Sequence, residues 1–450
     1  MLHNKRPYLK AIVALITTAF IFPTPAFTAA DVANTANEET ATTKRIPMED
    51  VQRFSNALGQ IKKYYVKPVD DKELFDNAIR GMLNGLDPHS TYLDEDSFKE
   101  LQTSTSGEFG GLGIEVTMED GVVKVVTPLV DTPAFKAGIK AGDYIIKLGT
   151  QSVQGISLKE AVDLMRGKEG TTLDLTILRK GESKPLVFSL IREKILIKSV
   201  KSKLLDDGYG YVRLTQFQAM TGEDMEKAIA QLKQQAGGHL KGLILDLRNN
   251  PGGLLDSAIQ VSDAFIDSGK NGQQEMIVYT QGRLPGSKFT ALANPGDILD
   301  NAPLVVLINN GSASASEIVA GALKDNKRAI ILGTQSFGKG SVQTVLPLDE
   351  KRGIKLTTAL YYTPSGTSIQ AKGITPDIVV EEITVPKAEN KADALAGFSE
   401  ADLNGHLLNK NETVEKQGQN ANKDDETLLH EDYQLYAALT ILKGLAVAKR

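Results

Sequence analysis

The feature that most constrains the fold is a strand, a small-residue turn and a helix encoded in direct succession. Residues 303–309 form a short apolar and β-branched run, which is typical of a buried parallel strand. Residues 311–316 are only Gly, Ser and Ala, and apolar side chains then recur over 318–323 at the spacing of one helix face. Such a unit predicts a parallel α/β sheet, whose ligands bind at the carboxyl ends of the strands.

Ser314 lies in this turn, and two interpretations of it stay open. Ser314 and Glu317 together fit a capping box, in which a serine caps an ordinary helix. Alternatively, Ser314 is a nucleophile at a helix N-terminus, where outward-pointing N–H groups can stabilise a developing oxyanion.

A second informative segment surrounds Lys339, 25 positions after Ser314. Residues 333–340 nearly match a phosphate-binding P-loop, but Gly340 stands where a magnesium-binding Ser or Thr is required, and the β-branched run that follows does not favour a helix. Ser336 and Lys339 match the S-x-x-K motif of penicillin-binding proteins, but its S-D-N and K-T-G partners are missing from the sequence. Both alternatives are therefore disfavoured.

Serine–histidine–aspartate catalysis is also disfavoured. The sequence has no G-x-S-x-G motif, and its five histidines lie in terminal or turn-like segments. We interpret His89 and His239 as structural or solvated side chains. The five are His3, His89, His239, His406 and His430.

Lys339 can act as a base only if its amine is neutral, which requires burial to lower its pKa. Its neighbours are small or apolar, and no acidic residue lies between Thr334 and Leu348. Gln343, four positions on, is a candidate for orienting the amine. The segments around Ser314 and Lys339 therefore predict a serine nucleophile with a lysine base.

These two segments resemble the active site of the carboxyl-terminal processing proteases, or tail-specific proteases, a Ser-Lys family. The resemblance implies that Ser314 is the nucleophile, Lys339 the general base and Gln343 the orienting residue. Residues 245–254, Leu-Asp-Leu-Arg-Asn-Asn-Pro-Gly-Gly-Leu, also resemble a family motif. It implies that a backbone N–H of Gly252 or Gly253 joins that of Ala315 in an oxyanion hole. Without the family, Asn-Pro-Gly-Gly is simply a strong turn.

Short strands and one helix over residues 106–192 resemble a PDZ module. The helix is bounded by the capping box of Ser157 and Glu160 and by Gly167. In a PDZ domain, a glycine-containing loop offers backbone N–H groups to a peptide carboxylate while the peptide adds a strand to the sheet edge.

The resemblance assigns the carboxylate-binding loop to Gly111, Leu112, Gly113 and Ile114, and apolar neighbours predict a preference for an apolar terminal side chain. An ordinary glycine-rich hairpin is the alternative. Arg166 follows the helix, where it is either a favourable partner of the helix dipole or a link between tail capture and the active site.

Composition and the N-terminal residues predict an exported protein. Residues 1–30 have a basic start, an apolar stretch over 11–22 and small residues at 28–30, as in a signal segment. We expect a periplasmic location, with an uncleaved inner-membrane anchor as the alternative. The 450 residues include no cysteine, which excludes disulfides, and the net charge of −5 gives no indication of a nucleic-acid partner. No metal or other cofactor is implied.

The expected fold class is a multidomain α/β and α+β protein. A flexible lead (31–45) precedes an N-terminal helical region (46–105), the inserted PDZ domain (106–192) and an α/β catalytic domain with a largely parallel sheet (193–385). A polar linker (386–429) and a C-terminal helix (430–450) follow, the helix with an apolar stripe at Leu435, Ala438, Leu442 and Leu445.

An apolar stripe over residues 51–65 is either a core stripe or a seam for a partner helix, and its two heptads favour the core. Residues 86–92 also resemble the family, and residues 400–407 resemble its Gram-negative branch. The family further implies a homo-oligomer through terminal helices, and an adaptor or activator protein is a further expected partner.

The predicted function is a serine endopeptidase that captures free, apolar C-termini of proteins on its PDZ domain and cleaves the chains with Ser314 and Lys339, for processing or degradation. Two alternatives stay open. One is a non-enzymatic PDZ scaffold in which Ser314 is only a helix cap. The other is a penicillin-binding-like acyltransferase.

Overall fold

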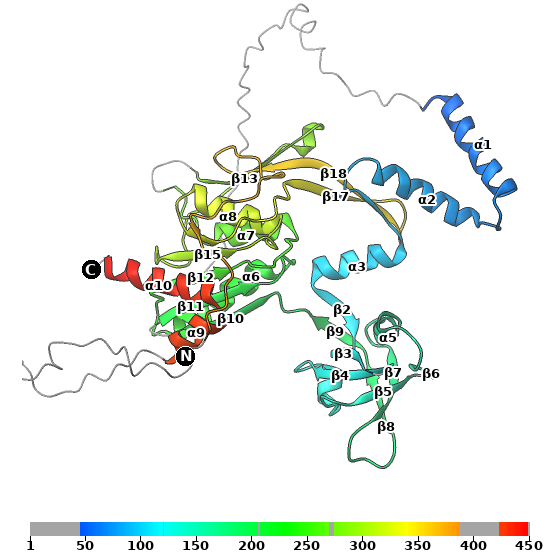
Figure 1. Ribbon diagram of the computed structural model, residues 1–450, viewed down its shortest axis with the longest axis horizontal. Helices are drawn as coiled ribbons and strands as arrows, with labels where there is room; N and C mark the ends of the chain where they lie inside the picture. The colour runs from blue at the N-terminus through cyan, green and yellow to red at the C-terminus, as the bar shows by residue number, and fades with distance from the viewer. Residues whose placement is uncertain (1–45, 120, 206–207, 270–273, 387–422, 449–450) are drawn as a thin grey trace, which may run out of the picture. The chain divides into compact units, whose positions relative to one another are not determined.

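The computed structural model describes residues 46–119, 121–205, 208–269, 274–386 and 423–448 (Figure 1). The chain forms two compact units, Met1–Leu74 and Phe75–Arg450. The expected signal segment and flexible lead lie outside the described residues. So do the residues that resemble the Gram-negative branch and most of the expected polar linker.

The first unit contains α1 (Met48–Tyr64), which has no buried residue. Val51, Phe54 and Ile61 of its apolar stripe are 46%, 43% and 43% exposed. The core interpretation of this stripe is therefore wrong for the described residues, because no described element of the unit covers it. Its second interpretation, a seam for a partner helix, stays a prediction.

Two helices flank a short strand before the PDZ domain. These elements are α2 (Asp71–Asn84), β1 (Thr91–Leu93) and α3 (Glu95–Ser106). The carboxylate of Asp94 caps α3 by accepting the N–H of Ser97 at 3.0 Å. Gly107 ends the helix with a left-handed φ of 76°.

The PDZ domain is an antiparallel sheet with two helices, α4 (Pro133–Lys136) and α5 (Leu158–Met165). The capping box predicted for α5 is confirmed by bonds of 2.7 and 3.2 Å between Ser157 and Glu160. A two-stranded ribbon of β2 (Glu108–Gly111) and β9 (Glu193–Leu196) lies where the chain enters and leaves the domain. The other strands are β3 (Ile114–Glu119), β4 (Val122–Pro128), β5 (Tyr144–Leu148), β6 (Gln151–Ser152), β7 (Thr172–Leu178) and β8 (Leu186–Ile191).

The domain that we expected to be catalytic is built on a six-stranded sheet in the order β10-β11-β12-β15-β16-β19. Only β10 is antiparallel to its neighbour, so the prediction of a largely parallel sheet is confirmed. Its strands are β10 (Val200–Leu205), β11 (Tyr209–Leu214), β12 (Gly242–Asp246), β15 (Leu304–Ile308), β16 (Ile330–Gly333) and β19 (Ile378–Val379).

Helices cover both faces of this sheet. Leu243 and Leu245 of β12 pack in one core with α6 (Thr221–Gln235), α7 (Leu255–Asp263) and α8 (Ala315–Asp325). Ile244, between them, packs on the other face with Leu442 of α10 (Tyr433–Ala448). Successive side chains of one strand thus point to opposite faces of the sheet, and both faces are buried in a core. This explains why these strands are continuous apolar runs.

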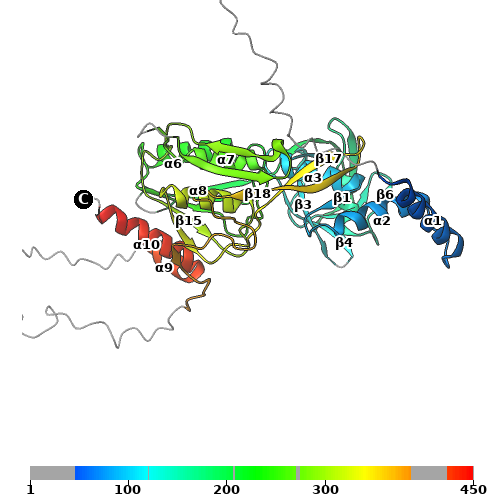
Figure 2. The ribbon, with the colours of Figure 1, turned by 90° about the horizontal axis from the view of Figure 1, so that it is seen from above.

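A second, antiparallel sheet was not predicted from the sequence (Figure 2). Its order is β1-β18-β13-β14, and β17 also pairs with β18. Its further strands are β13 (Met276–Gly282), β14 (Phe289–Leu292), β17 (Ser341–Pro347) and β18 (Gly353–Tyr362), and a 3-10 turn, η2, spans Pro285–Ser287. The strand β17 directly follows the segment of Lys339.

The C-terminal helix is confirmed as α10, which begins at Tyr433 and so slightly later than the expected residue 430. An additional helix, α9 (Lys423–Glu431), starts within the residues that we expected to be a linker. Leu428 of α9 packs against the same core as α10, which explains why the helix forms in so polar a segment. Leu435, Ala438 and Leu442 of the predicted stripe are at most 3% exposed.

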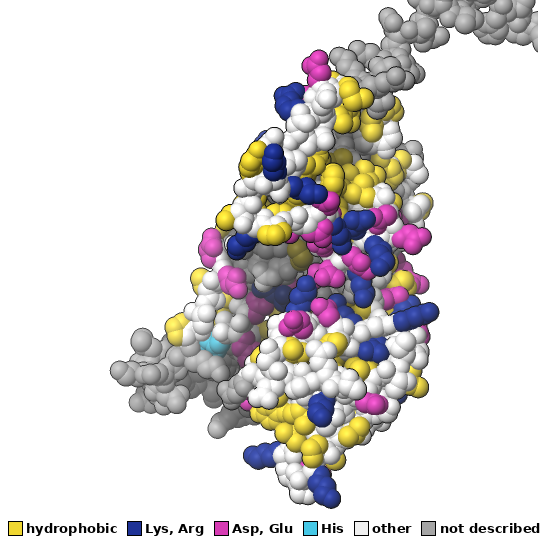
Figure 3. All heavy atoms as spheres, turned by 90° about the vertical axis from the view of Figure 1, so that its right-hand side faces the viewer, with side chains coloured by type: hydrophobic (Ala, Val, Ile, Leu, Met, Phe, Trp, Pro, Cys, Tyr) yellow, Lys and Arg dark blue, Asp and Glu magenta, His cyan; other side chains and the backbone are white. Residues whose placement is uncertain are grey.

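Apolar side chains also reach the surface. On the face drawn in Figure 3 they lie in patches between charged side chains. On the PDZ domain, Val130 and Val187 are 68% and 67% exposed.

Candidate active site

Ser314 stands between β15 and α8 in a strained backbone conformation, with φ of 54° and ψ of −110°. A helix-capping serine normally adopts extended angles, so Ser314 is not an ordinary cap. Strained non-glycine residues of this kind persist only where the surrounding structure holds them, and they cluster at functional sites. The first free N–H of the following helix belongs to Ala315.

The carboxylate of Glu317 holds this turn. Glu317 is fully buried, and its Oε2 accepts the backbone N–H of Ser314 at 2.7 Å and that of Lys339 at 2.9 Å. Its Oε1 accepts the hydroxyl of Ser336 and the N–H of Gly338, both at 2.6 Å. One carboxylate therefore brings together the two segments that the sequence analysis singled out. The sequence placed Glu317 in a capping box and gave no signal of its second set of donors.

Lys339 lies in the loop between β16 and β17, and its side chain is partly buried. Burial lowers the pKa of its amine, and the positive charge of Lys355 lowers it further, whereas the charge of Glu317 opposes the shift. No ion pair joins Lys339 to Glu317 in the described part of the chain. The environment therefore favours the neutral amine that a general base requires.

Among the described residues, the Gln343 side chain is hydrogen-bonded to Ser341 and not to Lys339. Its amide donates to the hydroxyl of Ser341 at 2.8 Å and to the carbonyl of Ser341 at 3.1 Å. The pairing with β18 is irregular between Val342 and Gln343. Such bulges re-aim side chains next to active sites.

The Asn-Pro-Gly-Gly turn packs directly against Ser314. A Cβ on Gly252 would come within 2.9 Å of the Ser314 Cβ and 3.0 Å of the Ala315 nitrogen, so only glycine fits there. The N–H of Gly252 is already bonded to Oδ1 of Asn250 at 2.9 Å. The N–H of Gly253 has no acceptor among the described residues. Gly253 is therefore the better candidate for an oxyanion donor.

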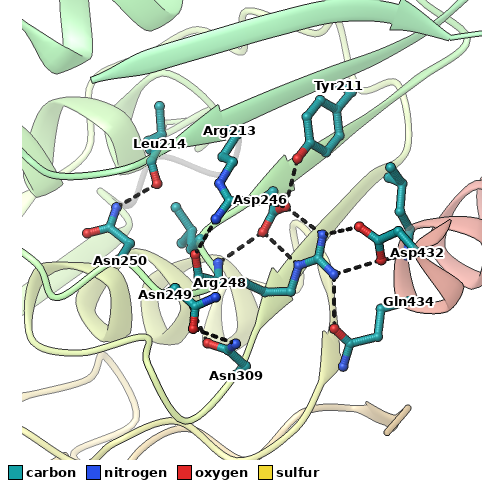
Figure 4. A network of polar contacts seen from close by, with 12 residues as sticks. Tyr211, Arg213, Leu214, Asp246, Arg248, Asn249, Asn250, Asn309, Asp432 and Gln434 are labelled. Atoms are coloured by element: carbon teal, nitrogen blue, oxygen red, sulfur yellow. Dashed lines mark hydrogen bonds and ion pairs between the residues drawn. The ribbon is translucent and has the colours of Figure 1, made fainter. Parts of the chain in front are cut away.

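A buried polar network lies behind this turn (Figure 4). Arg248 bonds Asp246 through Nε and Nη2 at 3.0 and 2.7 Å, and Asp246 is fully buried. The other side of the guanidinium bonds both oxygens of Asp432, at 2.8 and 2.7 Å. Tyr211 donates to Asp246 at 2.8 Å, and burial together with that carboxylate raises the pKa of the tyrosine. The sequence gives no sign of this network, because Asp432 lies 184 positions after Arg248.

Residues 87–90 attach the helical region to β18. The Asp87 carboxylate accepts the hydroxyls of Ser90 and Thr357 at 2.6 and 3.1 Å, and Ser90 accepts the N–H of Thr357 at 3.1 Å. Thr357 pairs with Gln343 in the sheet. Burial lowers the pKa of His89, and the charge of Lys339 lowers it further, so this turn lies near the proposed base.

Three of the four predicted tail-binding residues, Gly111, Leu112 and Ile114, line one cavity of the PDZ domain. Leu112 and Gly113 have N–H groups without acceptors among the described residues, as expected of a carboxylate-binding loop. Gly113 has φ of 74°, and a Cβ there would lie 2.3 Å from Thr132. The cavity is lined by Phe109, Gly111, Leu112, Ile114, Val162, Met165 and Arg166.

Arg166 ends the helix beside this cavity. Its guanidinium stacks over the ring of Phe109, 4.9 Å from the centroid. Its Nε is buried and has no hydrogen-bond acceptor among the residues that the structure describes. Arg166 is therefore part of the cavity wall, not only a charge at the helix end.

The described residues contain no cluster of His, Cys, Asp and Glu side chains that could hold a metal ion. Among the same residues, no helix is both long and apolar enough to cross a membrane.

Comparisons with known proteins agree with this architecture. Residues 208–380 match Peptidase family S41, and residues 110–190 match the PDZ domain. Residues 16–97 match the Activating protease CtpB N-terminal domain.

Individual proteins match over most of the chain. A carboxy-terminal-processing protease of Bartonella bacilliformis is 47% identical over 94% of this chain and 96% of its own length. The carboxy-terminal processing protease CtpA of Bacillus subtilis is 40% identical over 73% of this chain and 68% of its own. The solved structure of a photosystem II D1 C-terminal processing protease is 32% identical, with a TM-score of 0.42, over 73% of this chain and 86% of its own. The chain is therefore a serine-type peptidase that belongs to the carboxy-terminal processing protease family, within peptidase family S41.

Proposed function

We propose that this peptidase captures the free C-terminus of a protein substrate on its PDZ domain and cleaves the chain with Ser314 as nucleophile and Lys339 as general base. The observation that carries the proposal is the shared carboxylate of Glu317, which holds the backbones of both residues. The lowered pKa of Lys339 supports the role of base.

In the proposed reaction, the neutral Lys339 amine takes the proton of the Ser314 hydroxyl as Oγ attacks the scissile carbonyl. The N–H groups of Ala315 and Gly253 then stabilise the oxyanion. The lysine ammonium returns the proton to the leaving amine as the peptide bond breaks, which leaves an acyl-enzyme. A water molecule, deprotonated by the same amine, hydrolyses the ester and restores Ser314.

Gln343 has its proposed orienting role only when its amide leaves Ser341 and reaches the Lys339 amine. We assign the coupling between tail capture and this movement to Arg166. Its unpartnered Nε and its position in the cavity wall support the assignment, because a peptide carboxylate in that cavity would attract the guanidinium.

Partners and location are also proposals. The free N–H groups of Leu112 and Gly113 suit a carboxylate, and the apolar wall of the cavity suits an apolar terminal side chain. The exposed apolar stripe of α1 suits a second copy of the chain. The C-terminal helix is a second proposed contact in such a homo-oligomer. An adaptor or activator protein is a further proposed partner. The basic start and apolar stretch of residues 1–22 support export. The proposed location is therefore the periplasm, either free or associated with the inner membrane.

Digestion of a loosely folded protein with a free, apolar C-terminus tests the proposal. The mature chain should produce fragments, the Ser314→Ala variant should not, and a substrate with an amidated C-terminus should be cut more slowly. Cleavage by Ser314→Ala would exclude the proposed nucleophile. The penicillin-binding alternative predicts labelling of Ser314 by a β-lactam, and the scaffold alternative predicts tail binding without any cleavage. Membership of a peptidase family disfavours both.

A further inference from the structure

The C-terminal segment accepts three of the five side-chain hydrogen bonds of Arg248, which begins the turn beside Ser314. Arg248 is 7% exposed and Asp246 is fully buried, so the guanidinium depends on protein groups for its hydrogen bonds. From the chain between α9 and α10, Asp432 accepts two of these bonds. Gln434 Oε1 accepts a third at 3.0 Å.

The charges of this network balance only when Asp432 is present. Arg248 and Arg213 face Asp246, with Arg213 Nη1 at 3.9 Å and Arg248 Nη2 at 2.7 Å. Asp432 supplies the second carboxylate. Burial opposes the ionisation of Asp432, but the hydrogen bonds and charge of Arg248 outweigh it and lower the pKa of the carboxyl. Removing this charge would deprive the buried guanidinium of one of the two carboxylates that accept its hydrogen bonds.

The same turn makes direct contacts on both sides of Ser314. Two residues after Arg248, the carbonyl of Asn250 accepts the N–H of Ala313 at 3.0 Å and the hydroxyl of Ser316 at 2.9 Å. The Asn250 side chain accepts the N–H of Gly252 and donates to the carbonyl of Leu214 at 2.9 Å. A displacement that begins at Arg248 would therefore reach the N–H groups of Gly253 and Ala315.

We propose that Asp432 and Gln434 are positioning residues for the oxyanion hole, acting through Arg248. The inference rests on the proposed function, because it assigns a role to that same site. It predicts that the C-terminal helix is required for the chemical step as well as for the core. A misplacement of about 1 Å at a reacting group can lower a rate by about a hundredfold, so modest movement of the turn is sufficient.

Asp432→Asn is the test variant, because asparagine can still accept the N–H of Leu435, which Asp432 holds at 3.0 Å. The substitution thus removes the charge opposite Arg248 and spares the start of α10. The matched control is Asp297→Asn. The Asp297 side chain is only 2% exposed, and its Oδ2 lies 2.9 Å from the Nε of Arg328, near the opposite end of the sheet strands. The control therefore also removes a buried carboxylate charge from an arginine.

The kinetic arm measures kcat and KM for a peptide substrate, corrected for the fraction of molecules that a serine-directed fluorophosphonate labels. Asp432→Asn should lower kcat about tenfold or more, with KM and tail binding unchanged. Asp297→Asn should leave kcat at the wild-type value, even if it lowers the melting temperature as much as Asp432→Asn does. Equal effects of the two variants, or an unchanged kcat in Asp432→Asn, would overturn the inference.

The second arm does not depend on activity. Amide hydrogen exchange of residues 248–253, followed by mass spectrometry, should become faster in Asp432→Asn and stay unchanged in Asp297→Asn. Gln434→Met, which retains both carboxylates, should give a smaller increase and provides the same test if Asp432→Asn fails to fold. Wild-type exchange in the folded variants would refute the positioning role. If the wild type shows no cleavage that depends on Ser314, the proposed function fails, whereas the exchange result still decides whether the C-terminal segment holds the turn.

Discussion

The Glu317 carboxylate accepts the backbone N–H of Lys339 at 2.9 Å, while the Lys339 amine stays outside any ion pair with it in the described residues. The carboxylate therefore fixes the position of the lysine without holding its side chain as a salt-bridged cation. A direct ion pair would stabilise the charged amine and raise its pKa, which would oppose its proposed role as a base. The geometry separates placement of the proposed base from control of its protonation.

Loss of either proposed dyad residue should abolish turnover. Ser314→Ala and Lys339→Met should each lower kcat by at least about 10² to 10⁴. Lys339→Met should also raise the melting temperature, because a lysine whose folded pKa is lowered destabilises the fold at every pH below its unfolded pKa. Digestion assays and thermal unfolding at neutral pH measure both effects. Retained cleavage in Lys339→Met would contradict the assignment of the base.

Glu317→Gln should damage the site although it preserves the shape of the side chain. The new amide NH₂ would face N–H groups that now donate hydrogen bonds to the carboxylate. Each buried donor left without an acceptor lowers the stability of the fold by about 1 to 3 kcal/mol. We expect a lower free energy of unfolding and a lower kcat. Chemical denaturation and steady-state kinetics provide the measurements.

Glu226→Gln, an exposed position on α6, is the control for this substitution and should change neither quantity. Wild-type kcat in Glu317→Gln would mean that the carboxylate does not place the dyad.

The activity should depend on pH through Lys339. The amine is an effective base only when neutral, so the rate should rise with pH through the lowered pKa of Lys339 and fall below it. Lys355→Gln removes a positive charge that lowers this pKa, and should therefore move the acidic limb of the pH–rate profile to higher pH. Lys355→Arg retains the charge and should leave the limb in place. A shift of equal size in both variants would argue against the electrostatic explanation.

Gly113→Ala should disable tail capture. The residue has a left-handed φ of 74°, and the new Cβ would lie 2.3 Å from Thr132. Gly138→Ala imposes a similar strain, with φ of 82°, but its Cβ would meet no atom within 4 Å.

We expect the affinity for a peptide with a free C-terminus to fall about tenfold or more in Gly113→Ala, because this variant adds both strain and a clash in the carboxylate-binding loop. In Gly138→Ala, which adds strain without a clash, the affinity should fall little. Fluorescence anisotropy with the free-acid and amidated forms of one peptide measures this difference. Equal affinities of the wild type for the two forms would refute carboxylate recognition.

Much of the parallel sheet could be predicted because its strands are continuous apolar runs. The buried apolar run over residues 303–309, for which we predicted a strand, contains β15 (Leu304–Ile308). The antiparallel sheet could not be predicted in this way. It pairs Thr91 with Lys355 across most of the chain, and its strands are short or half exposed.

In the candidate site, too, features that depend on neighbouring residues could be predicted, whereas contacts between distant segments could not. Local sequence marks Ser314 and Lys339 through their small or apolar neighbours. The four donors to Glu317 come from two segments that only the fold brings together, and a Ser-x-x-Glu pattern gives no sign of the second segment. The histidine near the proposed base, His89, is likewise placed there by the contacts of Asp87 and Ser90 with β18.

The order in which a polypeptide is made gives the C-terminal contact another meaning. Asp432 follows Arg248 by 184 positions, and Ser314 and Lys339 both lie between them. A chain that emerges from its N-terminus has therefore produced its proposed nucleophile and base well before the second carboxylate of the buried network. If that carboxylate sets the active-site turn, a nascent protease stays inactive until Asp432 has been added, and the polypeptides beside it are protected during that part of its synthesis.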